Sequence, residues 1–305
     1  MSVDYPAHLE AIADAVRKGA CLLFLGAGVH APPPEGSAFE YPEDARPPLA
    51  SALSESLATA SRLTARHPRE NPTDLRRVAL FYEVERGRRD LEEHIRRAVH
   101  VGKEPSPVVR ALAELGFPLV VTTNYEQLFE NALVAAGRNP RVFIYGVDFE
   151  GARGERRGLL TTYERFGNPT PESPVVVKVH GDINHRETIV VTDEDYIKLS
   201  NHISGLAEYF TFLRHETSRW TTLIVGYSML DYDFRQVFTL YMEQDPYRFA
   251  PMYSVDYAPD ALLSEIWERQ RRMEYIRSNV WDFVPELYRL VLGKEMPNYS
   301  PQVST

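Results

Sequence analysis

The chain has 305 residues, 44% of them hydrophobic and 25% charged, which is ordinary for a folded protein and excludes a disordered or fibrous chain. Its 34 basic and 43 acidic residues give a net charge of −9, which argues against broad nonspecific binding to nucleic acid or an anionic membrane. No leader with a basic and an apolar part is visible, and no run approaches the ~18 apolar residues that span a bilayer. We therefore expect a cytoplasmic protein that makes no membrane contact.

Short apolar runs rich in valine, isoleucine and leucine predict strands at 21–25, 119–123, 142–145, 175–179, 188–192, 221–225 and 252–255. Several runs lack alternating polar residues, which is typical of strands buried on both faces of a parallel sheet. The only cysteine, Cys21, begins the first run, so we expect it in the core. A lone cysteine forms neither an internal disulfide nor a four-thiolate zinc site.

Helices are predicted between these strands. Residues 91–99 and 128–136 carry apolar side chains at the i, i+3/i+4 and i+7/i+8 spacing of a buried helix face. Further helices are expected at 4–18, 51–64, 74–85, 106–115, 204–216, 232–243 and 259–277. Because strands and helices alternate from residue 118 onward, the fold class predicted is α/β, with a doubly wound, mostly parallel, Rossmann-like sheet.

The stretch 36–115 has no convincing strand and is interpreted as a helical insertion after the first strand. It follows a proline-rich loop that begins at Pro32, and proline excludes regular structure there. The predicted organisation is one α/β domain over 1–293, with the insertion at 36–115 and a C-terminal tail at 294–305. Within the insertion, 62–103 holds 11 basic and 7 acidic residues. This segment is either a solvated helical face or a docking surface for an acidic partner or nucleic acid.

The first candidate site follows the first strand, where the chain reads Gly26-Ala27-Gly28. Glycines after a strand let backbone N–H groups close around a pyrophosphate. A turn of small residues that merely packs against a neighbour has the same sequence. An ordinary dehydrogenase would continue directly into a helix and place an acidic residue after a second strand, and neither feature is present here.

The second candidate, Thr122-Thr123-Asn124-Tyr125-Glu126, follows the strand predicted at 119–123. The carboxyl ends of strands are where α/β sheets bind ligands, so the Asn124 amide is suited to holding a ribose hydroxyl or a water. The alternative is that Asn124 caps a helix over 125–136 and that Gln127 completes a capping box.

The third candidate is His180, in the motif Lys178-Val179-His180-Gly181-Asp182 at another strand end. Imidazole titrates near neutral pH and is suited to taking a proton from a hydroxyl or a water. A histidine placed in a turn for structural reasons is the plain alternative. A second alternative is a metal site formed by His180, Asp182 and His185.

Two further strand ends complete the candidate set. Gly226 and Ser228 follow the strand at 221–225 and suit close approach to a nucleotide, whereas Asp231 caps the helix predicted at 232–243. Asp256 follows the strand at 252–255. It belongs to the predicted cofactor-binding set, although an ordinary strand end has the same pattern.

The order of these motifs, from the glycine loop through Thr-Thr-Asn-Tyr and Lys-Val-His-Gly to Gly-Tyr-Ser, resembles the sirtuin superfamily. The likeness is greatest to its bacterial sirtuin-like NAD-hydrolase branch. It runs from about residue 20 to 256, and the segment 192–196 (Thr-Asp-Glu-Asp-Tyr) fits the same branch. The resemblance implies a Rossmann-like sheet that binds NAD across its strand ends.

By this resemblance, Asn124 orders the nicotinamide ribose and the attacking water, and His180 acts as the base. The residues expected to bind NAD are Gly26, Ala27 and Gly28 at the pyrophosphate, Gly226 and Ser228 at the adenosine side, and Thr123 and Asp256. Two positions depart from the family pattern, because His30 stands where serine is usual and Glu126 where aspartate is usual. The resemblance therefore assigns no role to either.

The zinc module of protein-deacylating sirtuins needs two Cys-x-x-Cys pairs, and this chain has one cysteine. The function predicted is therefore an NAD glycohydrolase that releases nicotinamide and ADP-ribose with water as acceptor, and no metal is expected. The alternatives are a non-catalytic subunit that binds NAD or ADP-ribose or acts as a scaffold, and a zinc-free protein deacylase.

An enzyme that destroys NAD is toxic when always active, so its activity requires control. The prediction is a homo-oligomer, a companion protein, or both. The family's role in antiphage defence implies that the companion is a nucleic-acid-handling ATPase or a nuclease-like protein.

Overall fold

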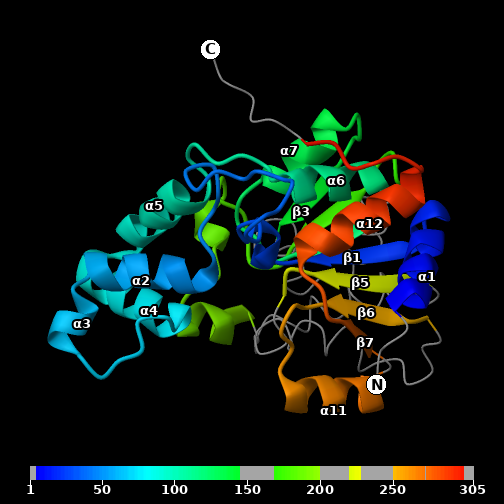
Figure 1. Ribbon diagram of the computed structural model, residues 1–305. Helices are drawn as coiled ribbons and strands as arrows, with labels where there is room; N and C mark the ends of the chain where they lie inside the picture. The colour runs from blue at the N-terminus through cyan, green and yellow to red at the C-terminus, as the bar shows by residue number, and fades with distance from the viewer. Residues whose placement is uncertain (1–4, 145–167, 200–219, 228–249, 272, 299–305) are drawn as a thin grey trace, which may run out of the picture.

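A single sheet of seven parallel strands forms the centre of the molecule (Figure 1). The computed structural model describes residues 5–144, 168–199, 220–227, 250–271 and 273–298. The strands are β1 (Cys21–Leu25), β2 (Leu119–Thr122), β3 (Arg141–Ile144), β4 (Val175–Lys178), β5 (Thr221–Val225), β6 (Met252–Val255) and β7 (Met273–Ile276). Residues of β1, β2, β4, β5 and β6 are buried throughout. These uninterrupted apolar runs are why the strands are central in a sheet covered on both faces.

The strand order is β3-β4-β2-β1-β5-β6-β7, and every neighbouring pair is parallel. The chain builds outward from β1 through β2 to the β3 edge, then returns to the other side of β1 with β5. The predicted doubly wound, Rossmann-like α/β class is confirmed. The order reverses between β1 and β5, and in open α/β sheets such a switch point leaves a crevice at the carboxyl ends of the strands where ligands bind.

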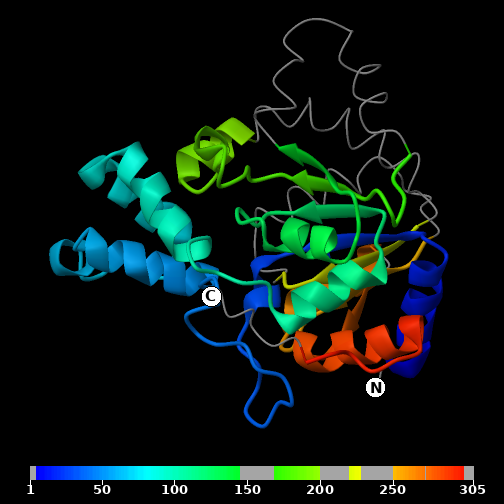
Figure 2. The ribbon, with the colours of Figure 1, turned by 90° about the horizontal axis from the view of Figure 1, so that it is seen from above.

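Among the described elements, four helices pack on one face of the sheet (Figure 2). They are α1 (Tyr5–Arg17), α6 (Pro107–Leu115), α7 (Leu128–Ala135) and α12 (Val280–Leu292). Their apolar side chains pack on inward-pointing residues of alternate strand positions, such as Leu23 and Leu223. The opposite face packs, among other described elements, on α11 (Ala261–Arg271) through Trp267. Cys21 is fully buried, as predicted for a core residue.

The helical insertion after β1 is present and lies beside the carboxyl ends of the strands (Figure 1). It consists of α2 (Ala50–Ala60), α3 (Leu63–Arg66), α4 (Leu75–Arg86) and α5 (Arg88–Val99). These helices share their own apolar core, which includes Leu57, Val78 and Ile95. Helix α6, although predicted within the same insertion, packs instead on the sheet with α7 and α12.

Basic residues of the insertion are mostly paired with acidic neighbours. Arg66 contacts Glu85, Arg77 contacts Glu70, and both Arg96 and Arg97 contact Glu93. Local pairing of this kind is typical of a solvated helical face, so it favours the first of the two interpretations of this segment.

The predicted strand at 188–192 is wrong. Residues Arg186–Thr188 form one turn of 3-10 helix, and residues 189–191 do not belong to a strand. Ile189 and Val191 are buried in the core of the insertion, whereas Val190 is buried against the sheet. The apolar run therefore belongs to a segment that lies between two apolar cores and not to a strand of the sheet.

The predicted helix at 259–277 is too long, and one helix lies outside the predicted elements. Helix α11 ends at Arg271, and Met273–Ile276 form the edge strand β7, paired with β6. Helix α12 follows directly. Its boundary signals are present in the sequence, since the Asn279 side chain accepts a hydrogen bond from the Asp282 N–H and Gly293 adopts a left-handed C-cap. Pro285 lies inside this helix, and a proline within a segment ordinarily argues against predicting a helix from the sequence.

The remaining predicted helices either lie among the described residues, where their spans can be compared, or lie outside them. Helices α1, α4 and α5 match their predicted spans closely. The helix predicted at 51–64 is divided into α2 and α3 at Ser61 and Arg62, and the helix predicted at 125–136 begins only at Leu128. The helices predicted at 204–216 and 232–243 lie outside the described residues. Among the helices that are described, none is both long and apolar enough to cross a bilayer.

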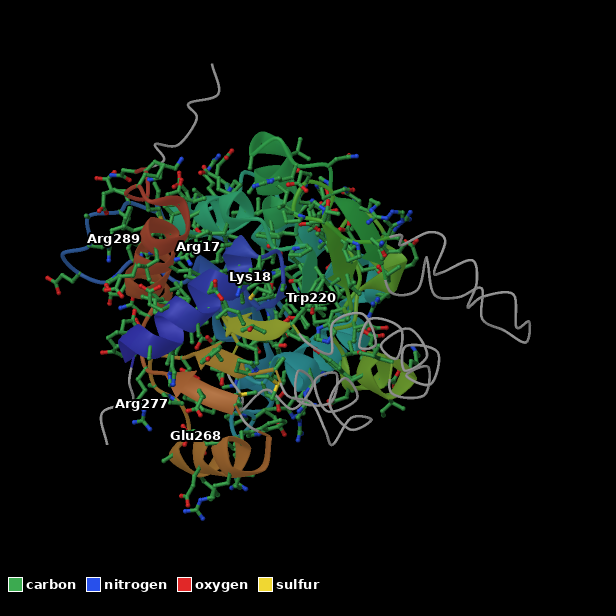
Figure 3. All side chains as sticks on the ribbon, turned by 90° about the vertical axis from the view of Figure 1, so that its right-hand side faces the viewer. Arg17, Lys18, Trp220, Glu268, Arg277 and Arg289 are labelled. Atoms are coloured by element: carbon green, nitrogen blue, oxygen red, sulfur yellow. The ribbon has the colours of Figure 1, made fainter. Side chains whose placement is uncertain are left out.

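Figure 3 views the molecule from the side of α1, away from the insertion. Arg17 and Lys18 lie at the C-terminal end of α1, where a positive charge is favoured by the helix dipole, and Lys18 pairs with Asp14 at 2.6 Å. The first tail residues lie against the proline-rich loop, because the Asn298 amide donates to the Ala38 carbonyl at 3.2 Å and Met296 is buried.

Candidate active site

A cavity of about 830 Å³ opens at the switch point of the sheet. Its volume falls within the range of roughly 300–1,000 Å³ for small-molecule sites. Loops that follow five strands contribute to its lining, through Gly28, Asn124, His180, Gly226 and Asp256 respectively. The parallel sheet brings these loops together because all its strands end at the same edge.

The glycine loops after β1 and β5 pack directly against each other. A Cβ atom added to Gly26 would lie 2.4 Å from the Gly226 carbonyl oxygen, and one added to Gly28 would lie 2.8 Å from it. The N–H groups of Gly26 and Gly28 donate to the carbonyls of Val225 and Gly226. These two N–H groups are therefore used in packing the two loops together, and the NAD-binding role expected for the glycines stays a prediction. Ala27 and Gly28 nevertheless line the cavity.

Gly226→Ala is expected to destabilise the protein by more than Gly137→Ala. Both glycines have similar positive φ angles, +77° and +75°, which cost alanine roughly 1–2 kcal/mol. Only at Gly226 would the new Cβ also meet backbone, 2.6 Å from the Gly26 oxygen, whereas nothing lies within 4 Å at Gly137. The free energy of unfolding in urea measures the difference. Equal losses would show that loop packing does not require this glycine.

The turns after β2 and β4 are held side by side by backbone hydrogen bonds. The Val179 N–H donates to the Thr122 carbonyl at 3.0 Å, and the Ile183 N–H donates to the Tyr125 carbonyl at 2.9 Å. This pairing continues the β2–β4 register beyond the strands. It is why Asn124 and His180, 56 positions apart in the chain, line the same cavity.

Asn124 is positioned from both sides of its turn. Its backbone N–H donates to the Thr122 hydroxyl at 3.0 Å, and that hydroxyl donates to the Leu25 carbonyl at the end of β1. The Asn124 side-chain Nδ2 donates to Glu126 Oε1 at 3.3 Å. Its other amide atom, Oδ1, is buried and has no hydrogen-bond partner among the described residues. The alternative in which Asn124 caps a helix is wrong, because α7 begins at Leu128.

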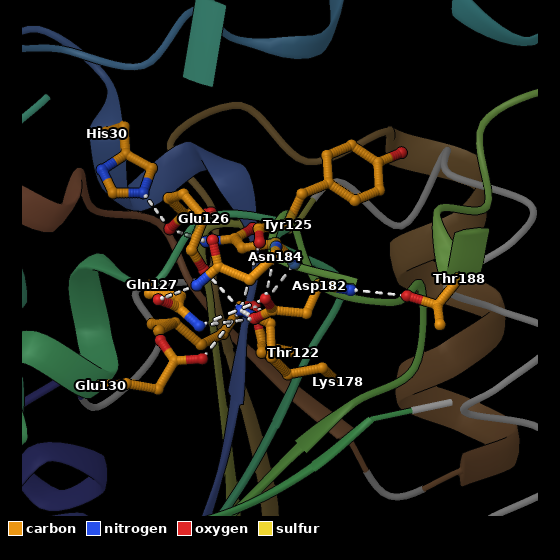
Figure 4. Close-up of polar contacts among 12 residues, drawn as sticks. His30, Thr122, Tyr125, Glu126, Gln127, Glu130, Lys178, Asp182, Asn184 and Thr188 are labelled. Atoms are coloured by element: carbon orange, nitrogen blue, oxygen red, sulfur yellow. Dashed lines mark hydrogen bonds and ion pairs between the residues drawn. The ribbon is translucent and has the colours of Figure 1, made fainter. Parts of the chain in front are cut away.

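Glu126 and His30 are in buried hydrogen-bond contact near Asn124, and Figure 4 shows the pair. The distance from His30 Nε2 to Glu126 Oε1 is 2.9 Å, and the two residues are 3% and 4% exposed. Burial alone raises the pKa of Glu126, but the His30 hydrogen bond and charge, aided by Lys178, hold that pKa below its ordinary value. Neither residue was assigned a role by the sequence, because the pair forms only when two distant loops meet.

His180 lies under Tyr196, in an edge-to-face contact with ring centroids 5.3 Å apart. The His180 carbonyl accepts a hydrogen bond from the Val190 N–H, and Tyr125 donates its hydroxyl to the Val190 carbonyl at 2.8 Å. Gly181 permits this turn, since a Cβ there would lie 2.2 Å from the Thr188 carbonyl oxygen. These contacts place a 4% exposed imidazole at the cavity wall.

The segment that holds His180 is itself tied to the helical insertion. Arg88 of α5 contacts Asp195 at 2.7 Å and donates to the Ile189 carbonyl at 2.6 Å. Asp195 accepts in turn from the N–H groups of Val191 and Thr192. Burial raises the pKa of Asp195, but Arg88 and these N–H groups lower it further than burial raises it. The insertion thus supports the segment that carries Tyr196.

One buried cation balances the acidic groups below the site (Figure 4). Lys178 is 0% exposed, and its Nζ lies 2.8 Å from Glu130 Oε1 and 2.8 Å from Asp182 Oδ2. Burial lowers the pKa of Lys178, but the surrounding carboxylates raise it above its ordinary value. Burial, together with the charge of Glu126, raises the pKa of Glu130 above its ordinary value. Lys178 offsets only part of this rise.

The metal-site alternative for His180, Asp182 and His185 is wrong. The Asp182 carboxylate is engaged by Lys178 and by the Gln127 amide, whereas the His185 side chain is 45% exposed. Among the described residues, no three side chains of metal-binding type gather at one point.

The remaining predicted residues lie as follows. Thr123 and Asp256 line the cavity, and the Thr123 N–H donates to the Tyr227 hydroxyl at 3.0 Å. Burial raises the pKa of Asp256. Ser228 and Asp231 lie outside the described residues.

Two walls of the cavity come from segments to which the sequence assigned no role. Trp281, near the start of α12, donates its indole N–H to the Ala31 carbonyl at 3.1 Å. The proline-rich loop contributes Pro32, Pro34 and Pro47. These residues carry no chemical signal in the sequence, because apolar and capping residues of this kind occur at most helix ends and loops.

A family model described as a SIR2-like domain matches residues 118–277, just over half of the chain. This span contains the turns that carry Asn124 and His180 and the loop of Gly226.

Three curated proteins, all called NAD(+) hydrolase ThsA, are similar to the chain. The protein from Acinetobacter baumannii (strain 532279) is 29% identical over 163 residues, 53% of this chain and 30% of its own. The protein from Cytobacillus dafuensis is 27% identical over 170 residues, which are 55% of this chain and 30% of its own length. The protein from Enterococcus faecium is 27% identical over 231 residues, which are 75% of this chain and 41% of its own length. The chain therefore spans less than half the length of each relative.

Proposed function

Because the chain belongs to the SIR2-like domain family, we propose that it is an NAD hydrolase that cleaves the bond between nicotinamide and ribose. The observation that carries the proposal is the meeting of Asn124 and His180 at one cavity on the switch point of the sheet. The relatives named NAD(+) hydrolase support NAD as the substrate and hydrolysis as the type of reaction.

The proposed chemistry asks little of the protein beyond positioning. Nicotinamide leaves as a neutral molecule from a cationic sugar, so the transition state resembles an oxocarbenium ion. Such a reaction depends on orienting the sugar and on excluding bulk water more than on a strong nucleophile. Asn124 Oδ1, which has no partner among the described residues, is placed to accept a hydrogen bond from a ribose hydroxyl or the attacking water. His180 takes the proton that this hydroxyl or water releases.

The proposal extends to the placement of NAD across the strand ends. The pyrophosphate lies along Ala27 and Gly28, where the absence of large side chains leaves room, and the adenosine lies toward Gly226, Ser228 and Asp256. Thr123, which directly precedes Asn124, also lines the cavity. No metal takes part in the proposed reaction.

We also propose that the activity is controlled. Continuous hydrolysis would exhaust cellular NAD, so the enzyme acts as a homo-oligomer or with a companion protein that handles nucleic acid. The proposed biological role is that of a toxic effector in prokaryotic antiphage defence, as the resemblance implies. The proposed location is the cytoplasm, where NAD is available.

The test is to incubate the purified protein with NAD at several protein concentrations and to separate the products by chromatography. We expect equimolar nicotinamide and ADP-ribose, with a rate per subunit that rises as the protein associates. Binding of NAD without any product, in the presence and absence of the genomic-neighbour protein, would contradict the enzyme assignment and favour a binding subunit. A full rate from the monomer alone would contradict the proposed control.

A further inference from the structure

The carboxylate of Glu126 contacts two neighbours: His30, as Figure 4 shows, and the Asn124 amide. We propose that Glu126, charge-balanced by His30, is a positioning residue that fixes the orientation of the Asn124 amide for the reaction. This inference rests on the proposed NAD hydrolysis and assigns a role to the two positions that depart from the family pattern.

The first step is the orientation of the amide. An amide side chain has a donor end and an acceptor end, and both have nearly the same shape. An ionised carboxylate can only accept hydrogen bonds, so the Nδ2 end of Asn124 must face Glu126 Oε1, 3.3 Å away. The acceptor Oδ1 is then the end left without a partner among the described residues, and Asn124 lines the cavity. Glu126 thus decides that the site presents an acceptor.

The second step is the charge on Glu126. This residue is 4% exposed, and an isolated carboxylate at that depth would become protonated. A protonated Glu126 could donate to Asn124 Oδ1 and reverse the amide. His30 Nε2 lies 2.9 Å away and supplies the donor that keeps the carboxylate ionised. The positive charge of Lys178 also favours an ionised Glu126. Lys178 Nζ does not contact the Glu126 carboxylate itself; it contacts the Glu126 backbone carbonyl and the side chains of Glu130 and Asp182.

The third step is the support of His30 itself. Its second ring nitrogen, Nδ1, lies 3.4 Å from the hydroxyl of Tyr41, and that hydroxyl donates to the Glu104 carbonyl at 2.9 Å. The Tyr41 proton is therefore already used, so the tyrosine oxygen is left to accept from Nδ1. With Glu126 at Nε2 and Tyr41 at Nδ1, both ring nitrogens of His30 have an oxygen within contact. The Glu126 carboxylate thus accepts from His30 on one side and from the Asn124 amide on the other.

The experiment compares Glu126→Gln, His30→Gln and the double variant with the unmodified protein. Glutamine at 126 is isosteric but offers both a donor and an acceptor, so the Asn124 amide loses its bias. We expect each single variant to lower the kcat of nicotinamide release by about ten- to a hundredfold, which is the scale of a misplaced reacting group. Affinity for carba-NAD, which cannot be hydrolysed, should stay within about threefold. The double variant should be no slower than the slower single variant, because the two residues act as one unit.

The control is Glu114→Gln, which removes a carboxylate that pairs with Tyr288 and Lys294 away from the cavity. Its kcat should equal that of the unmodified protein. An unchanged kcat in Glu126→Gln and His30→Gln, a loss expressed only as weaker carba-NAD binding, or fully additive losses in the double variant would each overturn the proposal. If one single variant fails to fold, the other single variant still tests whether His30 and Glu126 position the Asn124 amide.

A second readout does not depend on turnover. In ¹⁵N-labelled protein, the side-chain amide protons of Asn124, identified by their loss in Asn124→Asp, should exchange slowly with solvent and should exchange faster in Glu126→Gln. Equal exchange in the two proteins would overturn the proposed orientation. If the unmodified protein releases no nicotinamide, the proposed function fails, whereas the amide measurement still tests whether Glu126 holds Asn124.

Discussion

Replacing His180 by alanine is expected to slow nicotinamide release by roughly 10²–10⁴-fold, the usual contribution of a positioned general base. His180 lines the cavity, is 4% exposed and is held by Tyr196 and by the Val190 N–H. Asn124→Ala should cause a loss of similar size, since it removes the buried Oδ1 acceptor on the same cavity. The measurement is kcat for nicotinamide release under NAD saturation.

The matched control for this pair is His185→Ala. His185 belongs to the same loop as His180, but its side chain is 45% exposed and does not line the cavity. Its activity should remain within about twofold of the unmodified protein, since a surface substitution of this kind usually changes little. Nicotinamide release at the unmodified rate from both His180→Ala and Asn124→Ala would refute their assignment as the reacting pair.

Lys178→Met is expected to lower the free energy of unfolding by about 3–5 kcal/mol, the cost of removing one partner from a buried ion pair. Methionine fills a similar volume, so packing is largely kept. What is lost is the only cation within contact of Glu130 and Asp182 among the described residues, and Asp182 is 0% exposed. The remaining buried carboxylates repel each other, and they also support the turn that carries His180.

Urea unfolding measures this loss, and Lys198→Met is the control. The Lys198 side chain is 67% exposed and lies 3.9 Å from Asp195, so its replacement should change stability by less than about 1 kcal/mol. A triple variant, Lys178→Met with Glu130→Gln and Asp182→Asn, should recover part of the loss because it leaves no buried charge unpaired. Equal stability of Lys178→Met and Lys198→Met would show that the cluster has no electrostatic role.

The central strands were predictable from their residues alone. The runs at 21–25 and 221–225 contain only residues that favour strands, and each must be buried on both faces, so β1 and β5 match the predicted spans. The same reasoning failed where an apolar run had another destination. Ile189 and Val191 enter the core of the insertion, and hydrophobicity alone does not show which core an apolar residue enters.

The supporting residues of the site were less predictable than the strand-end residues. Asn124 and His180 stand out because an amide and an imidazole at strand ends suggest chemistry. His30 and Glu126 are 96 positions apart and meet only in the folded chain. In the sequence, Lys178 is only the polar end of an apolar strand. That the charges of Glu126, Glu130 and Asp182 act on it becomes evident only in the folded chain. The glycines at 26 and 28 suggested a phosphate cradle, but their N–H groups pair with the loop after β5.

The amino-acid order by itself determined the parallel sheet, the insertion after its first strand and the residues found where strands end. It could do so because burial on two faces and strand termination are local properties of a run of residues. Only the tertiary structure decided which loops touch, which charges share a counter-ion and which end of the Asn124 amide contacts Glu126. Those outcomes depend on hydrogen bonds and Coulomb interactions between residues far apart in the chain, whose distances are set by the packed sheet.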